Sequence, residues 1–414
     1  MAARPRKCSL PVEVCERVVG YLDIMNEGDY RTLLNCALVS RGWYPASRAV
    51  FLETVYLKTR KQPYNLNHML KVNPNNGLAE RIRCVHLSGL EASEPTKKPA
   101  VYSPVSAFPP VFVRKLPNLR TLEICCINPW DHSIGRDFYL ALGLFDKVES
   151  LTLRDITFPS LSEFAQFVCA LPNLKFLSCE ALRWDRHNPS PFIFLQHGPR
   201  ATVSELVLKT MRAPMADAMD FLLPYVSRTD LRRLRVGPVS ASDVKESRIQ
   251  ELLHQIGPSL QRITLKLDPA IDDERRHEEY FSLEKNIALE TLSLEIKAFH
   301  EKTYDLSWLP PLLSSISSKQ IRDIHIRLVI DTPQDVFDSV NAGFTPARCS
   351  LIDRTCTSSG FANLRRLAIQ VFDYSDASMN KRRTARWCKR FAEYFSGLQK
   401  KQILFIEILP VMRY

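Results

Sequence analysis

A short apolar pattern recurs along most of this 414-residue chain at a nearly constant interval. One copy consists of an apolar residue, a second one three positions later and a third two positions after that. Between Leu119 and Leu289 successive copies begin at residues 119, 148, 174, 203, 231, 260 and 289, so the step stays between 26 and 29 residues. Unrelated strands of an ordinary α/β domain would not keep such a step. The interval therefore predicts a fold built by repetition of one supersecondary unit.

The pattern extends over residues 51–414, with further copies that begin at Leu52, Ile82, Ile321, Leu364 and Ile403. In each copy we expect a short strand whose apolar residues point into a shared core, while the residues between them point outward. The segments between copies have helical spacing, as at residues 161–168, and predict a layer of helices. The pattern resembles the leucine-rich repeat. That resemblance implies an α/β fold, a curved solenoid with parallel strands on its concave face and helices outside.

Two stretches interrupt the regular step, at residues 91–112 and 331–361. The first belongs to a proline-rich segment, which predicts an extended loop that does not add to a helix. The second is polar and contains several Gly, Pro, Ser and Thr residues, which predicts a long insertion between two strands. Such an insertion is either a projecting binding segment or a disordered spacer, and the sequence leaves both alternatives open.

The first 50 residues follow a different pattern. Val14, Val18 and Leu22 recur four positions apart and predict a helix after Pro11. A second helix with leucines and a third that begins near Trp43 follow. A segment of about 40 residues is near the lower limit for independent folding, so these helices must pack on the repeats, on a partner or on both. Because the third helix leads directly into the first repeat copy, we expect a rigid junction without a linker.

The same segment also has an ordered set of motif residues: Leu10-Pro11-x-Glu13-Val14, Val18, Leu22, Leu33-Leu34 and Leu38-Val39-Ser40-Arg41-x-Trp43. This pattern resembles an F-box over residues 8–50, in the divergent form found in many fungal proteins. The resemblance implies docking to the Skp-type adaptor of a cullin-based ubiquitin ligase. The adaptor-binding residues it implies are Leu10, Pro11, Val14, Val18, Leu34, Leu38, Val39 and Trp43. Alternatively, some of these residues form only the internal core of a three-helix cap.

The net charge of +11 permits binding to an acidic partner or to nucleic acid without establishing either. The outward positions of the predicted strands are more informative, because they form a net basic ladder on the open face. From it we predict a target-binding set of Arg154, Lys209, Arg233, Arg235, Arg262, Lys266 and Arg327. Guanidinium groups suit bidentate capture of carboxylate or phosphate, so an acidic or phosphorylated target is expected. The alternative is that a sheet face open to water carries polar residues in any case.

The sequence contains no phosphate-binding glycine loop, no HExxH metal motif and no GxSxG elbow, so we expect neither a catalytic activity nor a cofactor. The 11 cysteines lack framework spacing, which is typical of reduced thiols used as small apolar residues. No apolar run reaches membrane-spanning length, and no membrane partner is expected. The basic residues at 381–390 are interleaved with aromatic residues at helical spacing. This pattern favours an amphipathic helix whose basic residues face the solvent over a nucleic-acid-binding patch.

The sequence therefore favours the substrate-recognition subunit of an SCF-type ubiquitin ligase, located in the cytoplasm, the nucleus or both. Such a subunit would hold an adaptor with its first helices and an unknown protein target with its repeats. The alternative is a free-standing leucine-rich-repeat scaffold or a nucleic-acid-associated protein without a ligase role, and nucleic acid is the less favoured partner.

Overall fold

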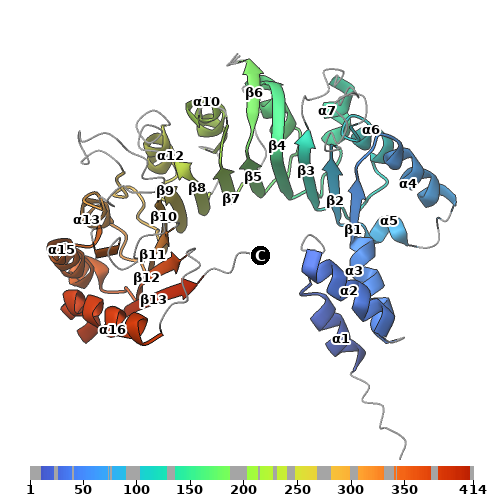
Figure 1. Cartoon of the computed structure of the whole chain (residues 1–414). Coiled ribbons are helices and arrows are strands. Elements are labelled where there is room, and N and C mark those ends of the chain that lie inside the picture. Colours follow the sequence, from blue (N-terminus) through green and yellow to red (C-terminus); the bar gives the residue numbers. More distant parts are fainter. Residues whose placement is uncertain are drawn as a thin grey trace, which may run out of the picture. The chain divides into compact units, whose positions relative to one another are not determined.

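The computed structural model (Figure 1) describes residues 11–22, 27–39, 42–72, 74, 77–89, 103–127, 136–186, 203–212, 215–226, 231–239, 248–267, 281–298, 306–330, 340–341, 343–373 and 381–410. Over these residues the chain is a mixed α/β protein with a 13-stranded sheet. The chain divides into two compact units. Unit 1 comprises Met1–Thr157 and Ala170–Asn173, and unit 2 comprises Phe158–Cys169 and Leu174–Tyr414.

Unit 1 combines three leading helices with four parallel strands, which lie in the order β1, β2, β3 and β4. Its elements are α1 (Val12–Val19), α2 (Glu27–Val39), α3 (Trp43–Glu53), β1 (Thr54–Leu57), α4 (Lys61–Val72), α5 (Leu78–Arg81), β2 (Cys84–Ser88), α6 (Phe108–Phe112), β3 (Thr121–Ile127), α7 (Arg136–Leu142) and β4 (Ser150–Ser160). Helix α3 ends at Glu53 and β1 begins at Thr54. This confirms the expected junction without a linker.

In the described part of unit 2, the strands β5, β7, β8, β9, β10, β11, β12 and β13 lie in this order, each parallel to its neighbour. Its elements are α8 (Leu161–Cys169), β5 (Phe176–Glu180), β6 (Arg183–Arg186), β7 (Glu205–Lys209), α10 (Met215–Val226), β8 (Arg233–Val239), α12 (Ile249–Gln255), β9 (Arg262–Leu267), β10 (Thr291–Ala298), α13 (Leu309–Ser314), β11 (Asp323–Ile330), α15 (Pro346–Thr357), η4 (Ser359–Phe361), β12 (Arg366–Asp373), α16 (Lys381–Ala392), η5 (Glu393–Phe395), α17 (Ser396–Lys400) and β13 (Leu404–Pro410). Strand β6 lies off this order and was not predicted.

The repeated apolar pattern explains the strand register. In each of its twelve copies, the second and third apolar residues lie in a strand. Corresponding residues of successive copies are direct neighbours, as Leu234, Ile263 and Leu292 are in β8, β9 and β10. These side chains are almost completely buried. In unit 2, helices α10, α12, α13, α15 and α16 lie on one side of the strands (Figure 1). The expected parallel strands with helices between them are confirmed.

The expectation of an extended proline-rich loop is wrong for residues 103–112. They include the short helix α6, and Pro109 and Pro110 stand in its first turn, where a missing N–H costs little. Phe108 and Phe112 are fully buried, and the rings of Phe108 and Phe145 stack with their centroids 5.6 Å apart. This part of the segment therefore belongs to the core. Residues 91–102 lie outside the described residues.

The second expected insertion is also packed where it is described. Thr345 caps α15, and its side chain accepts a hydrogen bond from the backbone N–H of Arg348. The buried Asp353 carboxylate accepts hydrogen bonds from the backbone N–H groups of Gly397 and Leu398 at 2.9 and 2.8 Å. These bonds join α15 to α17. Residues 343–361 are therefore neither a projecting segment nor a spacer, whereas residues 331–339 lie outside the described part of the chain.

The basic stretch near the end of the chain forms helix α16, as expected. Phe391 is buried and its ring stacks on that of Trp387 at 4.7 Å. Arg386, Lys389 and Arg390 are exposed on the same helix. The prediction of an amphipathic helix is confirmed. None of the helices in the described ranges is both long and apolar enough to cross a membrane.

Candidate functional site

The three leading helices of unit 1 share a very small core. It consists of Val19 from α1, Leu33 from α2 and Ala46 from α3. Trp43 and Phe51 are partly buried and pack against it, together with a few other residues. A core of this size leaves many apolar side chains of these helices outside it, so the core alone does not account for the apolar content of the segment.

The apolar side chains left outside this core form two stripes. Val14 and Val18 on α1 and Tyr21, two residues after its end, follow one another at helical spacing, and Tyr21 is 82% exposed. On α2, Leu34, Leu38 and Val39 are exposed, with Leu38 at 84% and Val39 at 74%. We call these six residues the apolar helix surface. Several large apolar side chains that are exposed on neighbouring segments are typical of a surface that binds another protein.

The apolar helix surface contains five of the eight predicted adaptor-binding residues: Val14, Val18, Leu34, Leu38 and Val39. Pro11 is exposed directly before α1. Trp43 instead packs against the internal core, so the alternative of a core role holds for that residue. Leu10 lies outside the described residues. Tyr21 was not predicted, although its position seven residues after Val14 places it on the same stripe.

A second candidate surface is the strand face of unit 2 opposite the buried apolar residues. Side chains alternate along a strand, so the residues between the core positions share this face. The register then aligns them in rows across the sheet. One row contains Arg262, Thr291 and Asp323, and the row two residues further along contains Thr264, Ser293 and His325. This regular arrangement follows directly from the repeat.

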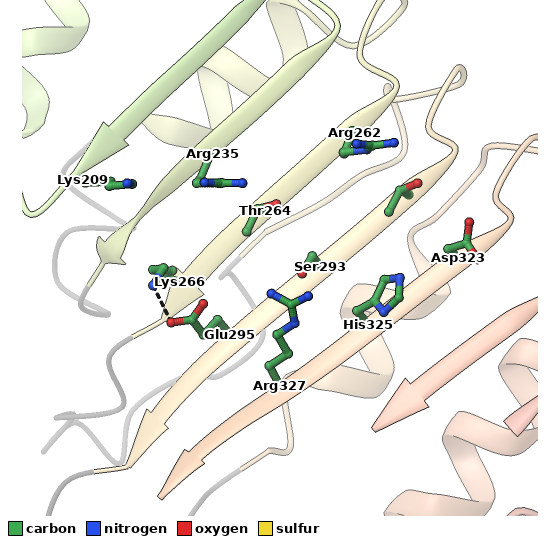
Figure 2. A pocket seen from close by; sticks show the side chains of 11 residues that line it. Lys209, Arg235, Arg262, Thr264, Lys266, Ser293, Glu295, Asp323, His325 and Arg327 are labelled. Atoms are coloured by element: carbon green, nitrogen blue, oxygen red, sulfur yellow. Dashed lines mark hydrogen bonds and ion pairs between the residues drawn. The ribbon is translucent and has the colours of Figure 1, made fainter. Parts of the chain in front are cut away.

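These rows line a pocket of about 440 Å³, shown in Figure 2. The side chains belong to five neighbouring strands, β7 to β11. The lining residues, which we call the basic pocket, are Lys209, Arg235, Arg262, Thr264, Lys266, Thr291, Ser293, Glu295, Asp323, His325 and Arg327. Five of them are cationic and two are acidic. The pocket therefore has an excess of positive charge together with three hydroxyl groups.

The pocket unites most of the predicted target-binding residues. Lys209, Arg235, Arg262, Lys266 and Arg327 all line it. The other two predicted residues, Arg233 and Arg154, are not among the lining residues. Arg233 is the direct neighbour of Arg262 in the register, and it forms an ion pair with Glu205 at 3.2 Å. Arg154 belongs to β4. The sequence analysis did not predict the hydroxyl residues Thr264, Thr291 and Ser293, although they also lie between the apolar core positions of their strands.

The cations of the basic pocket differ in how they are paired. Lys266 forms an ion pair with Glu295 at 2.5 Å, visible as the dashed line in Figure 2. Arg327 donates a hydrogen bond from Nε to Gln370. Within the described ranges, Lys209, Arg235 and Arg262 have neither a hydrogen-bond nor an ion-pair partner for their side chains. Three cations are thus available to an incoming anionic group.

His325 does not add a further positive charge to the pocket at neutral pH. Its burial, followed by the positive charges of Arg366 and Arg327, lowers the pKa of the His325 imidazole. Its Nδ1 atom is buried and has no hydrogen-bond partner among the described residues. A neutral imidazole beside hydroxyl groups can donate one hydrogen bond and accept another, which adds direction to a site whose attraction comes from the arginines and lysines.

The two candidate surfaces differ in chemistry and lie in different units. The apolar helix surface belongs to unit 1 and offers Val, Leu and Tyr side chains, whereas the basic pocket belongs to unit 2 and offers guanidinium, ammonium and hydroxyl groups. No protein-family model and no curated protein sequence match this chain. The function must therefore be argued from these two surfaces and from the motif residues in the sequence.

Proposed function

We propose that the chain is a substrate-recognition subunit of an SCF-type, cullin-based ubiquitin ligase in the cytoplasm, the nucleus or both. Its first three helices act as an F-box that docks a Skp-type adaptor, and its leucine-rich repeats hold a target protein. The observation that carries the proposal is the exposure of the motif residues Val14, Val18, Leu34, Leu38 and Val39. The chain then contributes no catalytic residue, and it acts by raising the effective concentration of the target at the ligase.

The adaptor side of the proposal rests on the cost of exposing apolar side chains. A leucine that is 84% exposed, as Leu38 is, gains little stability from the fold of its own chain. Burial in a partner groove contributes about 1.5 to 3 kcal/mol for one such side chain. Helices that present apolar residues at three- and four-residue spacing are recognised in this way by grooves of partner proteins.

The target side rests on the basic pocket. Carboxylate or phosphate groups of a target segment would meet Lys209, Arg235 and Arg262 without displacing a partner from any of them. Thr264 and Ser293 lie between these cations and Arg327, so hydroxyl donors are available to the same anion. An acidic or phosphorylated protein segment is therefore the ligand class that the pocket fits best.

The adaptor claim is tested by co-purification of the full chain with a Skp-type adaptor. A Leu34→Ala, Leu38→Ala, Val39→Ala variant should lose at least about tenfold in adaptor recovery, because each tenfold corresponds to about 1.4 kcal/mol. The matched control changes two other exposed leucines of unit 1, Leu140→Ala and Leu144→Ala, and should bind like the wild type. Equal recovery of the two variants, with unchanged circular dichroism spectra, would remove the basis of the proposal.

A free-standing leucine-rich-repeat scaffold or nucleic-acid-associated protein is the second candidate. The observation that favours it is the positive charge of the basic pocket and of the exposed Arg386, Lys389 and Arg390 on α16. This candidate predicts binding to RNA or DNA without an adaptor, with an affinity that falls steeply as salt is raised because phosphate contacts release counterions. Nucleic-acid binding that is absent at low salt would eliminate it.

A further inference from the structure

A cluster of three reactive side chains lies on the strand face of unit 1. Cys84 and His86 belong to β2 and are two positions apart, so both side chains project from the same side of the sheet. Glu123 on β3 and Tyr56 on β1 are the direct neighbours of His86 in the register. The fold thus surrounds one imidazole with a thiol, a carboxylate and an aromatic ring. Neither the adaptor nor the target claim uses this cluster.

The geometry assigns a different partner to each nitrogen of the imidazole. His86 Nδ1 lies 2.9 Å from Glu123 Oε2, and His86 Nε2 lies 3.3 Å from Cys84 Sγ. The Tyr56 ring stacks on the imidazole, with centroids 4.8 Å apart and an angle of 9° between the planes. Only 5% of the His86 side chain is exposed. The ring is therefore held in one orientation on both edges and on one face.

This order of groups is that of a nucleophile, a base and an orienting carboxylate. A hydrogen bond from Nδ1–H to Glu123 leaves the lone pair of Nε2 directed at the thiol. The proton of Cys84 can pass to Nε2, and the Glu123 carboxylate then stabilises the imidazolium. The product is a thiolate, which is the nucleophilic form of cysteine. Cys84 is partly exposed.

Several other cysteines are deeply buried. Burial raises the pKa of each of the Cys169, Cys349 and Cys356 thiols to about 12. These thiols stay protonated at neutral pH and react slowly, because the thiolate is the reacting species. In the described part of the chain, the combination of a thiol, an imidazole and a carboxylate in a single cluster is found at Cys84 alone.

A metal site is the other use that such a cluster suggests, and the geometry disfavours it. The three candidate ligand atoms lie within 4.8 Å of one another. However, Cys84 and Glu123 face opposite nitrogens of the imidazole, and a single ion can bind only one of these nitrogens. Structural zinc sites use four protein ligands, and catalytic ones use three. The described residues supply no further His, Cys, Asp or Glu to this cluster.

We propose that Cys84 is a modification site that takes up small-molecule disulfides, activated by His86 and oriented through Glu123. The Cys84 thiolate attacks one sulfur of the disulfide, a new sulfur–sulfur bond to Cys84 forms, and the old one breaks. Cys84 is oxidised, the released thiolate is the reduced product, and it takes the proton that His86 received. The adduct would stand on the strand face of unit 1, where it changes the shape and charge of that surface.

The test treats the reduced full-length chain with oxidised glutathione and follows each cysteine by peptide mass spectrometry. We expect Cys84 to be modified at least about tenfold faster than Cys36, a partly exposed thiol on α2. His86→Gln should slow the modification of Cys84 by about tenfold and leave that of Cys36 unchanged. Glu123→Gln should have a smaller effect in the same direction.

A second measurement protects the test against misfolding of the variants. Circular dichroism spectra of His86→Gln and Glu123→Gln should match the spectrum of the wild type, so that a slower reaction of Cys84 reports the loss of the base. A rate for Cys84 no greater than that for Cys36, or an unchanged rate for Cys84 in a folded His86→Gln variant, would overturn the proposal. Both results are obtained without the adaptor, so they are independent of the proposed ligase role.

Discussion

The leading helices of unit 1 and the strands of unit 2 distribute their apolar side chains in opposite ways. In the strands, Leu234, Ile263 and Leu292 are almost completely buried, and charged residues occupy the other face. Among the described residues of the helices, Val19, Leu33 and Ala46 form a small buried core, and residues such as Leu38 are exposed. The same residue types therefore stabilise the fold in one region and remain available to a partner in the other.

The largest effect is expected from the strand core. Ile263 lies between Leu234 and Leu292 in the register and has no exposed surface. Ile263→Ala should lower the free energy of unfolding of unit 2 by about 3 kcal/mol, because the truncation removes buried methyl groups and leaves a cavity. Denaturant unfolding followed by circular dichroism measures this loss, with Ile263→Val as the milder control. A midpoint like that of the wild type would show that the register does not place Ile263 in a tightly packed core.

The next effect concerns a polar contact within unit 2. Asp353→Ala removes the acceptors of the Gly397 and Leu398 backbone N–H groups, which join α15 to α17. We expect a loss of about 2 kcal/mol, because the N–H groups lose their partner in a buried position. Hydrogen exchange of these two amides gives a local readout. Asp353→Asn keeps one acceptor oxygen and should lose less, and an unchanged exchange rate in Asp353→Ala would contradict the prediction.

The strand pattern was predictable because its physical cause is local. An apolar residue at every core position fixes which residues point inward, and a constant step brings equivalent residues into register. The same rule places His86 beside Glu123, because each directly follows the second apolar residue of its copy. What the sequence did not provide is the orientation of the imidazole, which depends on Tyr56 and on the hydrogen bonds at both nitrogens.

The two errors of prediction have a common origin in composition. Prolines predicted a loop at residues 91–112, yet in its described part Pro109 and Pro110 fit the first turn of a helix. Polar residues predicted an insertion at residues 331–361, yet in its described part Cys349, Ile352 and Cys356 lie at helical spacing and are buried. In both cases the spacing of a few buried side chains outweighed the average character of the segment. The motif alone also could not say which of the eight predicted adaptor-binding residues are exposed and which are in the internal core. Exposure distinguishes Leu38 from Trp43, and the motif does not.

The charged face of the strands is tested by charge reversal in the basic pocket. Arg235→Glu should weaken the binding of a fluorescent polyglutamate peptide by about tenfold, since it replaces an unpaired cation with an anion; tenfold corresponds to about 1.4 kcal/mol. Lys400→Glu, on α17, changes the net charge equally and is the matched control. Fluorescence anisotropy at constant salt provides the affinities. Equal losses in both variants would mean that net charge, and not the pocket, attracts the peptide.

A smaller effect is expected from pH. The pKa of His325 is lowered in the folded state, by burial and then by the charges of Arg366 and Arg327. Below the ordinary value of 6.5 the unfolded chain therefore binds a proton that the folded chain resists, and stability falls as the pH falls. Above that value His325 makes no difference. His325→Asn should lose less thermal stability than the wild type between neutral and mildly acidic pH. Parallel pH profiles of the melting temperature would refute this.

The smallest effect on stability is expected for the apolar helix surface, although the proposed function predicts that substitutions there weaken adaptor binding. Leu38 is 84% exposed, so Leu38→Ala removes few contacts and should change the free energy of unfolding by less than about 0.5 kcal/mol. Leu33→Ala, five residues earlier on the same helix, is the matched control, because Leu33 is completely buried and should cost about 3 kcal/mol. Thermal unfolding of both variants measures the difference. If Leu38→Ala is as destabilising as Leu33→Ala, Leu38 supports the fold of its own chain, and the apolar helix surface loses its strongest argument for a partner.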